Sequence, residues 1–155
     1  MRRIRVYADT SVFGGAVDEE FSQSSRPFFE RLGRGEFVLL VSTETLRELS
    51  SAPTMVREVL QRIAEEYMES VSVGTEVEAL AEAYMSAGIL GRASRSDAIH
   101  VAAATVAEAD LIVSWNFRHI VNLDRIAKYN AVNVLNRYRP IEIRSPAEVA
   151  YGNET

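Results

Sequence analysis

Residues 7 to 13 read YADTSVF, and this stretch decides how the rest of the chain is interpreted. It closes an apolar segment, Arg3 to Ala8, whose β-branched and aromatic residues are typical of a buried strand. The segment ends at a carboxylate, Asp9, which two hydroxyl residues follow at once. Asp9 is therefore expected at the carboxyl end of a strand, either as the cap of the next turn or as a functional group.

Strands and helices are expected to alternate along the chain. Four further apolar segments are predicted as strands: Phe37 to Ser42, Ser70 to Val73, Leu111 to Ser114 and Ile141 to Arg144. Helical spacing of apolar residues predicts helices near Ser25 to Leu32, Thr43 to Ser50, Thr54 to Glu69, Thr75 to Ala87, Ser94 to Glu108 and Leu123 to Asn136. The polar tail from Ser145 is expected to be loosely ordered.

Short apolar strands without a polar face, separated by helices, favour a parallel sheet with helices on both sides. In such sheets, ligands bind at the carboxyl ends of the strands, near the point where the strand order reverses. Asp9 is expected there, and so is Asn116, which lies just past the apolar run LIVSW.

Length and composition predict one domain, residues 1–155, with ordinary globular character. The net charge of −5 argues against a general basic surface for nucleic acid but allows local clusters of Arg. Without cysteine, any metal must be held by oxygen or histidine. No window is long and apolar enough for a membrane span or a signal peptide, so a cytoplasmic protein without a membrane partner is expected.

The acidic residues differ in how well local structure explains them. Glu44 falls in the first turn of a helix that Ser42 can cap, where an acid is favourable. Glu48, one turn later, has no such explanation. Asp97 has the spacing of a capping box with Ser94, which favours a structural role, although the closely packed helix after it would hold the acid rigidly.

Four blocks of the sequence, taken in order, resemble PIN-domain ribonucleases, a family that includes the toxins of bacterial and archaeal toxin–antitoxin pairs. The blocks are YADTSVF, the pattern SxxxxxEL from Ser42 to Leu49, SDAIHVAAA from Ser96 to Ala104, and SWNFRHI from Ser114 to Ile120. The resemblance implies a PIN-like α/β fold, a three-layer α/β/α sandwich with a central parallel sheet of about five strands. It also implies a metal-dependent endoribonuclease acting on RNA, with an antitoxin protein and a second copy of the chain as partners.

Carried over position by position, the resemblance makes Asp9, Glu48 and Asp97 ligands of Mg²⁺ or Mn²⁺. Asn116 stands where many relatives carry a further Asp, and an amide brings no charge, so a second metal is less secure. Hard cations of this kind prefer oxygen ligands and activate water for phosphodiester hydrolysis. His100 and His119 lack a histidine partner at metal-site spacing and are expected to be structural or to support neighbouring groups.

Residues that flank the expected cluster are candidates for substrate binding. Arg92, Arg95 and Arg118 would offset the repulsion between the acids and an RNA backbone. Ser11 and Ser114 are expected either to bind a phosphate oxygen or to orient the cluster, and capping of the backbone would explain them equally well.

Other classes of protein with an Asp at a strand end fit less well. Haloacid-dehalogenase-like phosphatases need a second Asp where this chain has Ser11, and response-regulator receivers need a late-strand Lys, whereas the single Lys128 lies in a predicted helix. No glycine-rich phosphate loop is present. The remaining alternative is a PIN-like module that binds RNA or a protein without cutting.

Overall fold

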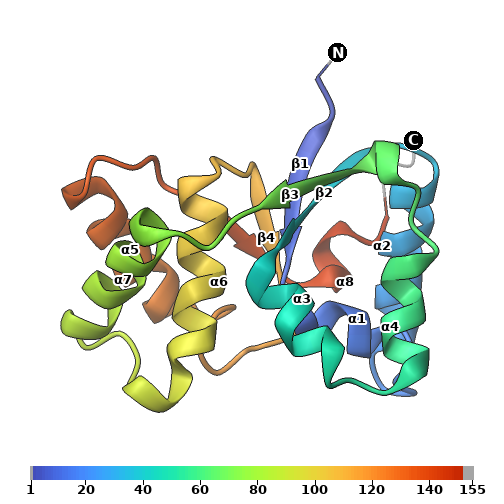
Figure 1. Ribbon diagram of the computed structural model, residues 1–155, viewed down its shortest axis with the longest axis horizontal. Helices are drawn as coiled ribbons and strands as arrows, with labels where there is room; N and C mark the ends of the chain where they lie inside the picture. Colours follow the sequence, from blue (N-terminus) through green and yellow to red (C-terminus); the bar gives the residue numbers. More distant parts are fainter. Residues whose placement is uncertain (1, 152–155) are drawn as a thin grey trace.

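A computed structural model, which describes residues 2–151, contains one sheet of five parallel strands in the order β3-β2-β1-β4-β5 (Figure 1). The strands are β1 Ile4–Ala8, β2 Phe37–Ser42, β3 Met68–Val71, β4 Leu111–Val113 and β5 Glu142–Arg144. Every neighbouring pair is parallel. The α/β fold with a central parallel sheet of about five strands is confirmed.

Helices cover both faces of the sheet, which gives three layers (Figure 1). Alternate strand residues face opposite ways, so Tyr7 and Leu40 belong to one apolar core and Val6 and Leu39 to the other. The first core includes residues of α5 Thr75–Ser86, α6 Arg95–Val106 and α7 Leu123–Leu135. The second includes residues of α1 Thr10–Gly15, α2 Ser22–Gly33, α3 Thr43–Ser50, α4 Thr54–Gln61 and α8 Pro146–Val149.

The strand order reverses beside the central strand β1. The chain proceeds from β1 to β2 and β3 on one side and then returns to place β4 and β5 on the other. Asp9 follows β1 directly, and its backbone N–H donates to the carbonyl of Val113, the last residue of β4, at 3.2 Å. The predicted location of Asp9 at the switch point is therefore confirmed.

The predicted helix from Thr54 to Glu69 is wrong in its second half. Helix α4 ends at Gln61, a short 3₁₀ helix (η1, Glu65–Tyr67) follows, and β3 begins at Met68, two residues before the predicted strand start. Met68 pairs with Leu39 of β2. Apolar residues from Ile63 to Met68 continue to pack into the second core, so they kept the appearance of helical spacing after the helix had ended.

The C-terminal segment also departs from the expectation of loose order. Within the described residues it forms α8, in which Pro146 is buried and which Ala150, also buried, follows. Arg31 donates to the carbonyl of Val149 at 3.0 Å. Among residues 2–151 there is no helix with the length and apolarity that crossing a membrane requires.

Candidate active site

Asp9 is a buried carboxylate, only 4% exposed, at the carboxyl end of β1. It occupies the position before the first residue of α1, yet its side chain caps no backbone N–H in the described part of the chain. Instead, the Ser11 hydroxyl donates to Asp9 Oδ1 at 2.6 Å and accepts from the backbone N–H of Trp115 at 2.9 Å. Helix capping, one of the two explanations that the sequence left open, does not account for Asp9.

The surroundings of Asp9 make its negative charge costly. Burial raises the pKa of this carboxyl to about 6, against the opposing effects of His100, Ser11 and Ser114, and the nearby charge of Asp97 raises it further. A buried acid next to a second acid is an arrangement that a bound cation would stabilise. Such perturbed groups are common at functional sites.

Glu48 extends from α3 and lies half-buried beside Asp9's neighbour Thr10. The Thr10 hydroxyl donates to Glu48 Oε1 at 2.8 Å, and His100 Nε2 donates to the same oxygen. Burial alone would raise the pKa of Glu48, but these two hydrogen bonds and the charge of His100 bring it below its ordinary value. The other oxygen, Oε2, has no hydrogen-bond partner among residues 2–151, so it is free for a ligand.

Asp97 lies in the first turn of α6, half-buried, but not in the predicted capping box. The Ser94 side chain caps nothing in the described structure; its hydroxyl lies 3.3 Å from His119 Nε2. Burial raises the pKa of Asp97, and the charge of Glu48 adds to this effect, whereas His119, His100 and a hydrogen bond from Asn116 oppose it. Asp97 and Glu48 are therefore close enough to interact electrostatically.

The side-chain oxygen of Asn116 does not face the acids. Its Oδ1 accepts a hydrogen bond from the backbone N–H of His119 at 2.9 Å. The side-chain nitrogen is thus the part of Asn116 left to interact with Asp97, and this interaction lowers the pKa of Asp97. In this arrangement the side-chain oxygen of Asn116 is already used by the backbone of His119.

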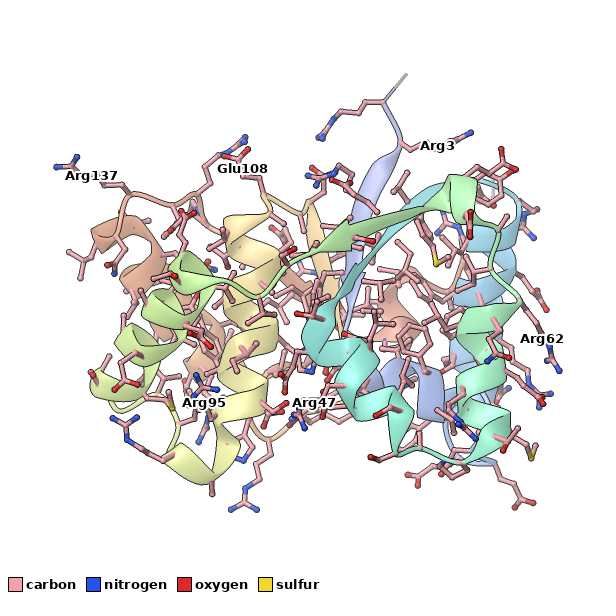
Figure 2. All side chains as sticks on the ribbon, in the orientation of Figure 1. Arg3, Arg47, Arg62, Arg95, Glu108 and Arg137 are labelled. Carbon is pink, nitrogen blue, oxygen red and sulfur yellow. The ribbon has the colours of Figure 1, made fainter. Side chains whose placement is uncertain are left out.

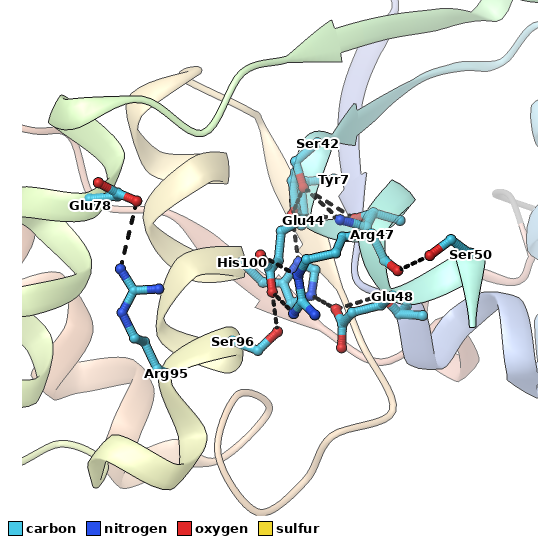
Figure 3. Close-up of polar contacts among 12 residues, drawn as sticks. Tyr7, Ser42, Glu44, Arg47, Glu48, Ser50, Glu78, Arg95, Ser96 and His100 are labelled. Atoms are coloured by element: carbon cyan, nitrogen blue, oxygen red, sulfur yellow. Dashed lines mark hydrogen bonds and ion pairs between the residues drawn. The ribbon is translucent and has the colours of Figure 1, made fainter. Parts of the chain in front are cut away.

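Two groups at this edge of the sheet were not assigned to the site from the sequence (Figure 3). Glu44 is 8% exposed; it accepts a hydrogen bond from Ser96 Oγ at 2.8 Å and forms an ion pair with Arg47. Tyr7, placed in the sequence as a strand residue, bonds through its hydroxyl to His100 Nδ1 at 2.6 Å. The sequence did contain a signal for these contacts: Glu44 and Glu48 are spaced i,i+4 on one helix, and Ser96 and His100 have the same spacing on another.

The predicted substrate residues separate into two groups. Arg92 donates to Glu82 at 2.9 Å, Arg95 lies 3.7 Å from Glu78, and Arg118 is exposed, so all three guanidinium groups lie at the surface. Arg95 and Arg47 lie at the same end of the molecule, opposite to Arg137 (Figure 2). Ser114 is fully buried, and its hydroxyl accepts from the Asn116 N–H at 2.9 Å. The hydroxyls of both Ser114 and Ser11 therefore make hydrogen bonds within the protein.

The carboxylates of these acids are suitable ligands for a hard divalent cation, but they are too far apart in this structure to bind one ion together. Within residues 2–151, no three Asp, Glu or His side chains meet the spacing of a metal-ion site. Asp9, Asp97 and Glu48 nevertheless offer carboxylate oxygens, interact through their charges, and include the free Glu48 Oε2. Oxygen donors of this kind suit Mg²⁺ or Mn²⁺.

Comparisons with known proteins identify the fold and no closer relationship. No protein-family model matches the sequence, and no curated protein matches it. Among solved structures, the chain is similar to the crystal structure of VapBC2 from Rickettsia felis bound to a DNA fragment from its promoter. The TM-score is 0.57 at 13% sequence identity, and the match covers 92% of this chain and 98% of the other. The chain therefore has a PIN-like fold, as the four sequence blocks implied.

Proposed function

We propose that this chain is a metal-dependent endoribonuclease that hydrolyses RNA phosphodiester bonds as the toxin of a toxin–antitoxin pair. The observation that carries the proposal is Asp9, a buried carboxylate at the switch point of the sheet that no helix cap explains. A charge buried at this cost is retained where function requires it. The similarity of the fold to a VapBC complex supports the same function.

Asp9, Asp97 and Glu48 Oε2 would hold Mg²⁺ or Mn²⁺. The bound ion would supply an activated water and neutralise charge on the phosphate. Glu48, whose pKa is below its ordinary value, is ionised at neutral pH, which is the form that a metal ligand requires. Ser11 and Asn116 would hold Asp9 and Asp97 in orientation.

Surface cations would position the RNA. Arg95 and Arg118 flank the acids in sequence, at the start of α6 and just after β4, and both are exposed. Their charges would offset the repulsion between the acidic site and the phosphates. Because Asn116 offers an amide where a further acid would add charge, one metal ion fits this set better than two.

The partner that we propose is a small antitoxin protein with an apolar segment. A groove of about 520 Å³ runs between α2 and α4, lined by apolar side chains including Phe29, Met55 and Ile63 and bordered by Arg26 and Arg62. Met55 is 64% exposed there. If this groove holds the partner, Met55→Asp should weaken co-purification with the protein encoded by the adjacent reading frame.

The test of the proposed activity is cleavage of a mixed pool of RNAs by the metal-free protein after addition of Mg²⁺ or Mn²⁺. Wild type should cut, EDTA should stop the reaction, and Asp9→Asn should lower the rate by at least about 100-fold, as expected for loss of an essential ligand. Asp124→Asn, an exposed acid on α7, is the matched control and should cut like wild type. Equal cleavage by wild type and Asp9→Asn would refute the assignment.

A second candidate function is an RNA-binding module without cleavage. The separation of the acids and the amide at position 116 favour it. This module would bind the RNA pool equally well as wild type and as Asp9→Asn, with no cutting by either protein in the presence of metal.

A further inference from the structure

Two side-chain pairs join α3 to α6 in register (Figure 3). Glu44 of α3 accepts from Ser96 of α6 at 2.8 Å, and one helical turn later Glu48 of α3 accepts from His100 of α6. Both pairs are spaced i,i+4 on their own helices, so they form two successive rungs between the same faces. Asp97 lies between the two α6 rungs in sequence.

The second rung is anchored in the core. His100 is 2% exposed, and its other ring nitrogen, Nδ1, bonds to the Tyr7 hydroxyl at 2.6 Å. Tyr7 in turn bonds to Ser42 Oγ at 2.7 Å, and this oxygen accepts from the backbone N–H of Thr45 at 3.1 Å. Tyr7 and Ser42 are fully buried, so the hydrogen-bonded chain leads inward and ends at a helix cap.

This geometry distinguishes between two roles for His100. The chain reaches the surface only at Glu48 and ends in the core at its other end, so it cannot carry a proton through His100 from one exposed group to another. A chain of satisfied buried groups does fix the position of its outer end, because moving Glu48 would leave a buried ring nitrogen without a partner. The second donor to the same oxygen, Thr10, restrains Glu48 from the side of Asp9.

We infer that His100 is a positioning residue, which holds Glu48 by Oε1 so that Oε2 is presented to a divalent cation shared with Asp97. This inference rests on the proposed function and deepens it. His100 itself does not bind the ion, because both of its ring nitrogens are already in use. Partners of this kind around metal ligands typically contribute a factor of about 10–100 to metal affinity.

The test is Mn²⁺ binding to the metal-free protein, measured by calorimetry and independent of cleavage. His100→Leu should weaken binding about 10–100-fold. His100→Gln keeps an N–H at the end of the side chain and should recover most of the loss. In a Glu48→Gln background, His100→Leu should have little further effect, because both substitutions remove the same contact.

The matched control is Thr105→Val, which removes a buried hydrogen bond from Thr105 Oγ1 to the Val101 carbonyl in the same helix. Its Mn²⁺ affinity should equal that of wild type, and an equal loss in both variants would show that destabilisation of α6 explains the effect. If His100→Leu does not fold, Tyr7→Phe removes only the anchoring hydroxyl and should weaken binding in the same direction. Wild type that binds Mn²⁺ no better than Asp9→Asn would refute the proposed function and this inference with it. Wild-type binding that survives His100→Leu and Tyr7→Phe unchanged would refute the inference alone.

Discussion

At the scale of single residues, Asp9 should reduce the stability of the metal-free protein. Its folded pKa is about 6 and its ordinary value is 3.8. Above both values the buried charge is unfavourable by about 1–3 kcal/mol, at about 1.4 kcal/mol per pKa unit. Asp9→Asn, which keeps the shape without the charge, should therefore raise the free energy of unfolding at pH 7 by that amount, as measured by urea denaturation.

The pH dependence of the same comparison has a defined sign. Between pH about 4 and pH about 6 the folded protein keeps the Asp9 proton and the unfolded chain loses it. The free energy of unfolding of wild type relative to Asp9→Asn should therefore fall as pH rises through this window and become constant above it. A difference between the two proteins that does not change from pH 4 to pH 8 would contradict the raised pKa.

Asn116 makes a separate prediction about the number of metal ions. Its amide supports Asp97 and adds no charge. Asn116→Asp would add a fourth acid to Asp9, Asp97 and Glu48, so calorimetric titration with Mn²⁺ should change from one ion per chain to two. The exposed Asn136 is the control, because Asn136→Asp adds the same charge after the end of α7, away from β4. One ion per chain in both variants would show that charge at position 116 does not limit binding.

At the scale of elements, α1 packs closely against its neighbours at Gly15 but not at the adjacent Gly14. A Cβ at Gly15 would lie 2.6 Å from both Ser25 Oγ and Trp115 Nε1, whereas a Cβ at Gly14 meets nothing within 4 Å. The Ser25 and Trp115 side chains are hydrogen-bonded to each other at 2.7 Å, so neither gives way freely. Gly15→Ala should lower the free energy of unfolding by about 1–3 kcal/mol through overpacking.

The matched substitution Gly14→Ala should have the opposite sign. It lies in the same helix with open space around it, so alanine should stabilise the protein by up to about 1 kcal/mol. The unfolding temperature of both variants can be measured by thermal denaturation followed by Trp115 fluorescence. Equal shifts of this temperature in the two variants would show that the contact at Gly15 is not tight.

Element boundaries also show where the sequence was informative. The strands β1 and β2 were predicted because buried parallel strands are continuous apolar runs. The end of α4 was missed because residues after Gln61 continue to face the core, and local spacing does not register the change from helix to 3₁₀ helix and strand. The boundary depends on the pairing of Met68 with Leu39, a contact between distant parts of the chain.

At the scale of the whole molecule, the placement of the acids followed from topology. Parallel strands end at one edge of the sheet, so Asp9 and Asn116 could be assigned to that edge from the sequence. The partners of Glu44 and His100 could not, because the contacts between α3 and α6 depend on how the two helices pack. For His100 the sequence predicted only a structural or supporting role. Asp97 showed the same limit: its capping-box spacing was present, but Ser94 pairs with His119 from a distant loop.

The distribution of charge over the molecule yields the last prediction. The chain carries a net charge of −5, so RNA binding must rely on a few cations near the site. Arg95 begins α6, two residues before Asp97, and lies at the opposite end of the molecule from Arg137 (Figure 2). Arg118 follows Asn116 in the segment after β4. For binding of single-stranded RNA, the slope of log affinity against log salt concentration is roughly −0.7 per phosphate contact, so about three contacts give a slope near −2.

Arg95→Glu and Arg118→Glu should each raise KM. Each should also make the salt slope shallower by roughly 0.7, because each removes one phosphate contact. Arg137→Glu changes the net charge equally and should leave both KM and the slope at the wild-type values. If Arg137→Glu weakened binding as much as Arg118→Glu, net charge rather than position would govern the encounter with RNA, and the site at the carboxyl ends of the strands would lose its assigned substrate contacts.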